Sequence, residues 1–146
     1  MRILFTALSF IAGLAALPEA AAAQAGSCGG ALVPQADAES FSAAGRDADV
    51  ARLARETGTN FVAAASRLCG AGTLRAADLA AFTHLVVRNA EGTSEPVVYD
   101  DAEQGAENLI LEFAFADGPA PSEAAIGTAI RCWRQPETAG CDQGGD

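Results

Sequence analysis

The chain has 146 residues, half of them hydrophobic, and 19 acidic residues against nine basic ones give it a formal net charge of −10. Proteins bind nucleic acids and anionic membrane surfaces through Lys and Arg, so this charge argues against both classes of partner. The length suffices for one hydrophobic core and not for two.

Residues 1–25 have the pattern of a secretory signal peptide. Arg2 precedes an apolar run that ends before Pro18, and small residues follow, with cleavage expected after Ala23 or Ala25. The run is too short to span a bilayer as a stable helix. We therefore expect an exported protein, periplasmic or extracellular, with no transmembrane segment in the mature chain. A lipid anchor at Cys28 is a less favoured alternative, since it would leave an odd number of cysteines.

Four cysteines lie in the expected mature chain, where an oxidising compartment allows them to pair. Four cysteines permit three pairings. We expect Cys28 to pair with Cys69, and Cys132 with Cys141, because the short segment between the last two can fold back. A zinc site is disfavoured, since there is no Cys-x-x-Cys pair and only one His.

The mature chain should begin with an extended arm over residues 26–36, which is rich in Gly and contains Pro34. A single globular domain over residues 37–141 follows, and residues 142–146 should be a disordered tail. Two helices are predicted at about 48–56 and 60–69. Each has apolar residues at helical spacing, and Gly58 is expected to end the first.

Three strands are predicted at about 83–88, 96–99 and 108–115. The last is the most apolar, and alternation places Leu109 and Leu111 on its core face and Glu112 on the other. If 83–88 and 108–115 are antiparallel neighbours, Glu112 can pair with Arg88 or His84. A single helix from Arg75 to Val87 is the alternative for the first strand.

The clearest helix is predicted at about 122–134. Ser122 is a good N-cap, and Ile126, Ala129, Ile130 and Trp133 share one face. Together these elements predict an α+β fold: a small antiparallel sheet of two or three strands packed by helices, with two disulfides.

No positive residue lies between Arg88 and Arg131, and the acidic residues there are densest at Asp100, Asp101 and Glu103. These three are weak candidates for a calcium site, because hard cations bind carboxylate oxygens. The segment departs from the EF-hand pattern at Ala102 and Gln104. A solvated acidic loop is the preferred interpretation.

No catalytic residues are assigned, and no motif implies a cofactor. The one His has no nucleophile in a recognisable context, and the chain contains no phosphate-binding Gly-rich loop. We expect a non-enzymatic binding protein whose acidic region meets a basic protein, for example a cationic hydrolase that it neutralises. The alternatives are a hydrolase or lyase that uses paired carboxylates, or a weak calcium-binding protein.

Overall fold

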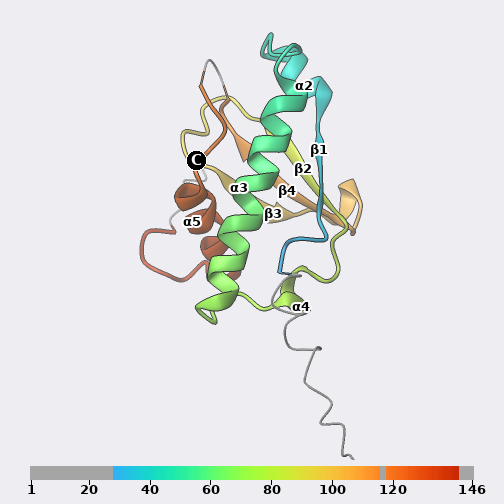
Figure 1. Ribbon diagram of the computed structural model, residues 1–146. Helices are drawn as coiled ribbons and strands as arrows, with labels where there is room; N and C mark the ends of the chain where they lie inside the picture. Colours follow the sequence, from blue (N-terminus) through green and yellow to red (C-terminus); the bar gives the residue numbers. More distant parts are fainter. Residues whose placement is uncertain (1–27, 116–117, 142–146) are drawn as a thin grey trace, which may run out of the picture.

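The computed structural model describes residues 28–115 and 118–141 (Figure 1). The expected signal peptide, the first two residues of the arm and the C-terminal tail lie outside the described residues. In chain order the elements are β1 (Val33–Ala36), α2 (Ala38–Ala43), α3 (Val50–Gly70), α4 (Ala76–Leu79), β2 (His84–Asn89), β3 (Val97–Asp100), the 3₁₀ helix η1 (Ala102–Gln104), β4 (Asn108–Phe113) and α5 (Glu123–Arg134). The predicted α+β class is confirmed.

The described strands form one four-stranded sheet with the order β1-β2-β4-β3. β2 pairs with both β1 and β4 in parallel, and only β3 is antiparallel to its neighbour β4. The sheet is therefore mixed. The antiparallel pairing that we predicted between 83–88 and 108–115 is wrong, and the strand count is higher than expected by one.

The connection between β2 and β3 explains the parallel pairing. A tight turn would have placed β3 directly beside β2. Residues 90–96 instead form a longer connection, so that β3 lies one strand further away and leaves a gap beside β2. β4 fills that position. It is the strand best suited to the centre of the sheet, because its residues Leu109, Ile110 and Leu111 are all fully buried.

β1 lies within the segment expected to be an extended arm. It pairs with β2 from Val33↔His84 to Ala36↔Val87, so the arm is the edge strand of the sheet. Pro34 is tolerated there because the outer side of an edge strand needs no donor.

A single helix, α3, replaces the two helices predicted at 48–56 and 60–69. The prediction that Gly58 ends the first helix is wrong. Gly58 is buried inside α3, where a Cβ atom would lie 2.8 Å from Cβ of Pro34. The glycine thus permits close approach of β1 and does not terminate the helix.

α3 and α5 pack against each other over one face of the sheet (Figure 1). The core between these layers contains Leu53 and Phe61 of α3, Ile126 and Ile130 of α5, and the inward-facing residues Leu85, Val87, Leu109 and Leu111 of the sheet. The predicted C-terminal helix is confirmed, and Oγ of Ser122 accepts a hydrogen bond from N of Ala125 at 3.2 Å.

Both predicted disulfides are present. Cys28–Cys69 ties the segment before β1 to the last turn of α3, and Cys132–Cys141 folds the chain back after α5. Among the described residues, no helix combines the length and the apolar character needed to cross a bilayer.

Candidate functional site

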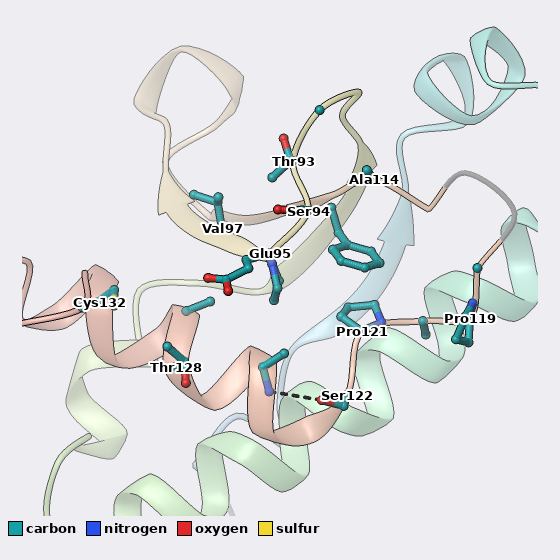
Figure 2. A pocket seen from close by; sticks show the side chains of 18 residues that line it. Thr93, Ser94, Glu95, Val97, Ala114, Pro119, Pro121, Ser122, Thr128 and Cys132 are labelled. Atoms are coloured by element: carbon teal, nitrogen blue, oxygen red, sulfur yellow. Dashed lines mark hydrogen bonds between the residues drawn. The ribbon is translucent and has the colours of Figure 1, made fainter. Parts of the chain in front are cut away.

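A cleft of about 890 Å³ lies between α5 and the segment that connects β2 to β3 (Figure 2). Residues 92–97 form one wall, and one face of α5 forms the opposite wall. The end of β4 and residues 118–122 close one end. Its size is within the range of ligand-binding pockets in proteins.

The 92–97 wall is held by the sheet. N of Ala114 donates to O of Thr93 at 2.9 Å, which attaches the loop to the residue that follows β4. Pro96 is buried at the entry to β3. The loop therefore has a defined position beside the cleft.

The segment before α5 is held by two side chains from distant parts of the chain. Nδ2 of Asn60 donates to O of Pro121 at 2.9 Å, and Nη1 of Arg46 donates to O of Phe115 at 2.9 Å. Both bonds satisfy carbonyl groups in a segment without regular structure. α3 and the chain that precedes it thereby position the closed end of the cleft.

The α5 wall consists of small side chains. Ala125, Thr128, Ala129 and Cys132 are at positions i, i+3, i+4 and i+7 and therefore share one helix face. The Cys132–Cys141 disulfide brings Gly140 to the far end of this wall. Small residues leave room for a ligand backbone to approach the helix.

Glu95 is the charged side chain in this lining, and Figure 2 shows its carboxylate between the 92–97 segment and α5. Hydroxyl groups come from Thr93, Ser94, Ser122 and Thr128. Ser122 is engaged as the helix cap, and Oγ1 of Thr128 donates to O of Ala124 and accepts from Nη2 of Arg131. A single carboxylate with hydroxyl groups and apolar surface can accept hydrogen bonds from a ligand and attract a cation.

The three acidic residues singled out by the sequence lie at and after the end of β3. Oδ1 of Asp100 accepts a hydrogen bond from Nε1 of Trp133 at 2.9 Å. Asp101 caps η1 by accepting from N of Glu103 at 2.9 Å. Across residues 28–115 and 118–141, no group of three or more His, Cys, Asp or Glu side chains is placed to hold a metal ion.

A second polar cluster joins α2, β2, β3 and β4. Nε of Arg88 donates to Oδ2 of Asp37 at 2.9 Å, and its Nη1 donates to Oε1 of Glu112 at 3.2 Å. The OH of Tyr99 donates to the same Glu112 oxygen at 2.5 Å. Burial and this hydrogen bond raise the pKa of Tyr99 to about 12.

The expected pairing of Glu112 with Arg88 is thus present, while Nδ1 of His84 lies 2.9 Å from Oγ1 of Thr83. The parallel register places Arg88 opposite Glu112. Sequence reasoning did not include Asp37 or Tyr99, because neither follows from local spacing. The guanidinium lies between two carboxylates, which is the arrangement of a structural ion pair.

The described acidic residues without an ion pair are concentrated in one segment of the chain. Within the described residues, six arginines pair with acids outside segment 91–107: Arg46, Arg52, Arg67, Arg75, Arg88 and Arg134. That segment carries six carboxylates, on Glu91, Glu95, Asp100, Asp101, Glu103 and Glu107. In the part of the chain that the structure describes, none of the six takes part in an ion pair. Five are exposed and Asp101 is half-buried.

The fold and the cleft define a two-layer α+β domain with two disulfides and an acidic surface. Comparisons with protein-family models, with curated proteins and with solved structures found no match to this chain.

The cleft itself was not predicted. Its lining comes from residues 92–97, 113–114 and 118–122, from one face of α5 and from Gly140. Most of these residues are Ala, Gly, Pro, Ser or Thr, which have no chemical signature of their own. Of the described acidic residues between Arg88 and Arg131, Glu95 is the one that lines the cleft.

Proposed function

We propose that this protein is an exported, non-enzymatic binding protein that docks a basic partner on the acidic segment 91–107. The observation that carries the proposal is the distribution of ion pairs. Arginines pair with six acids outside this segment, whereas its six carboxylates have no such partner among the described residues. Outside the segment, Glu39, Asp47 and Glu137 also lack an ion pair in the described part of the chain, but they are not gathered along one strand.

The segment surrounds β3, which is an edge strand. Glu91 and Glu95 precede this strand, and Asp100, Asp101 and Glu103 lie at and beyond its end. Unpaired carboxylates at both ends create a negative potential along this edge. Such a potential accelerates encounter with a positive partner at low ionic strength and weakens as salt screens it.

Two disulfides and an acidic exterior are compatible with an extracytoplasmic location. In that setting a basic hydrolase is a suitable partner class, because opposite net charge promotes association. Binding across its active site would neutralise it.

The test uses a triple variant, Asp100→Asn, Asp101→Asn and Glu103→Gln. The two Asn residues keep an acceptor for Trp133 and for the η1 cap. Binding to a purified basic ribonuclease is measured by calorimetry at about 20 mM and about 300 mM salt, together with its activity. We expect salt-sensitive binding that weakens by about tenfold in the variant.

A matched control removes three negative charges elsewhere, through Glu39→Gln, Asp47→Asn and Glu137→Gln. All three side chains are exposed and lie outside segment 91–107. An equal loss of binding in the control would show that net charge alone is responsible. Binding that is insensitive to both salt and the triple variant would remove the basis of the proposal.

A further inference from the structure

We propose that the cleft between α5 and residues 92–97 binds an extended peptide segment of the basic partner, with a Lys or Arg side chain facing Glu95. The inference rests on the proposed function, since it assigns to that partner a specific place of contact. It goes further because it distinguishes a shaped peptide site from a diffuse acidic surface.

The length of the cleft suits a short extended peptide. Its α5 wall runs from Ser122 to Cys132, which corresponds to about 15 Å at the rise of an α-helix. An extended chain advances about 3.3 Å per residue, so four or five residues span this wall. The volume of about 890 Å³ leaves room for their side chains.

The surface of the cleft suits a peptide backbone flanked by small or apolar side chains. Phe113 and Pro121 contribute apolar area, while Ala125 and Ala129 present little more than a methyl group on the helix wall. Ser94 and Thr93 add hydroxyl groups on the facing loop. A peptide can therefore bury apolar surface and still find hydrogen-bond partners along one side.

The charged groups around the cleft indicate which side chain the bound peptide should carry. Glu95 is exposed and faces the cleft, and Glu91 lies on the same connection between β2 and β3. Arg131 touches the opposite rim through its bond to Thr128 at 3.2 Å, so a cationic group fits beside the loop wall and not beside that rim. An acidic peptide would place its charge against Glu95.

The cleft is held in position before any ligand arrives. The Thr93–Ala114 bond fixes one wall, the Asn60–Pro121 bond fixes the closed end, and the Cys132–Cys141 disulfide fixes the far end. A site that is already ordered loses little conformational entropy on binding.

The experiment titrates the oxidised protein, labelled with ¹⁵N, with three capped hexapeptides that alternate Ala with Lys, with Glu or with Gln. We expect the Lys peptide to shift the amide resonances of Thr93, Glu95 and Thr128 in a saturable manner. Glu95→Gln should weaken its affinity about threefold, and Arg131→Gln should strengthen it by a similar factor. The Glu peptide should produce no saturable shift.

A steric variant separates shape from charge. Thr128→Trp fills the cleft from an exposed position of α5 and should abolish the shifts in residues 92–97. Ala124→Trp is the matched control, because residue 124 is exposed on the same helix and does not line the cleft. The affinity of the Ala124→Trp variant for the Lys peptide should equal that of the parent protein. If Thr128→Trp does not fold, the opposite effects of Glu95→Gln and Arg131→Gln still decide the matter.

Three outcomes would overturn the inference in different ways. Shifts confined to residues 100–107, with full binding to Thr128→Trp, would leave the acidic docking surface in place and remove the cleft as its peptide site. The absence of any shift with the Lys peptide at low salt would remove both the cleft and the proposed function. Equal affinity for the Glu peptide would refute the role of Glu95.

Discussion

The ring of Pro34 in β1 lies directly against the backbone of α3 at Gly58. A Cβ atom at position 58 would approach Cβ of Pro34 to 2.8 Å, closer than such atoms come in folded proteins. The helix and the edge strand therefore meet at a place where no other residue type fits without a shift. This contact, with the Cys28–Cys69 disulfide, holds the N-terminal part of the described chain to the domain.

Gly58→Ala should destabilise the protein by about 1–3 kcal/mol, as overpacking does in a close-packed core. The direction of this change in stability is informative, because Gly→Ala within an exposed helix normally stabilises a protein by about 1 kcal/mol. Urea unfolding measures the difference. Gly70→Ala in the same helix has free space around the added methyl group and should be neutral or stabilising. Pro34→Ala combined with Gly58→Ala should recover part of the stability that Gly58→Ala loses. If the stability changes of the two single variants simply add in the double variant, the contact is contradicted.

Thr57 is fully buried in α3, and its Oγ1 atom has no hydrogen-bond partner among residues 28–115 and 118–141. Thr57→Val removes the hydroxyl group and keeps the shape, so it should leave stability unchanged or raise it by about 1–2 kcal/mol. Thr57→Ser keeps the hydroxyl group and loses the methyl group, and should cost about 1 kcal/mol. Thermal unfolding of the two variants provides the measurement. A clear loss of stability in Thr57→Val would show that the hydroxyl group is bonded.

Tyr99 is the one tyrosine of the chain, so its ionisation can be followed by absorbance near 295 nm. Burial first, and then the hydrogen bond to Glu112, raise its pKa from 10.0 to about 12. The folded state therefore holds this proton more tightly than the unfolded state. The resulting stabilisation is complete below pH 10 and is lost as the pH rises from 10 to about 12.

Glu112→Gln should lower the pKa of Tyr99 only part of the way towards 10.0, because burial is the larger cause and persists. The protein in denaturant serves as the reference and should titrate near 10.0. Titration of the native protein at that same value would contradict the arrangement of Tyr99, Glu112 and Arg88.

The two disulfides should contribute unequally to stability. Cys28–Cys69 closes a loop with a sequence separation of 41, and Cys132–Cys141 closes one of 9. In the chain-entropy model, the first stabilises by about 4 kcal/mol and the second by about 3 kcal/mol. Paired Cys→Ala variants, unfolded in denaturant, test this order. A larger loss from removing Cys132–Cys141 would show that its native contacts around the cleft outweigh the loop entropy.

Local patterns in the sequence were sufficient for most elements. The i, i+3, i+4 spacing and the Ser122 cap predicted α5, and β-branched alternation predicted β2 over the alternative helix. Both disulfide pairs were also predicted, because the short segment between Cys132 and Cys141 can fold back and leaves Cys28 to pair with Cys69. Such signals depend on residues that are near one another in the chain.

The prediction failed where distant segments compete for the same place. Gly58 was expected to end a helix, but it lies within α3 and contacts Pro34. Residues near Gly58 in the sequence give no sign of this contact, because Pro34 is distant in the chain. Strands 83–88 and 108–115 were expected to be antiparallel, but they are parallel. Local sequence could not show this, because the path of residues 90–96 past β4 is set only when the sheet assembles. The cleft was not predicted for the same reason, because its Ala, Pro and Thr residues form a pocket only when several distant segments pack together.

By itself the sequence determined most helical and extended segments and the strongly acidic composition, and it favoured the sulfur pairs that the structure contains. Only the tertiary structure decided the order of the strands, the continuity of α3 and which carboxylates arginine neutralises. Periodicity and capping act over a few residues, whereas strand order and ion pairing depend on contacts between residues up to 56 positions apart, as between Arg134 and Asp78. The lack of ion-pair partners for the six carboxylates of segment 91–107 within the described residues is consequently a property of the fold, although the residues themselves can be read from the sequence.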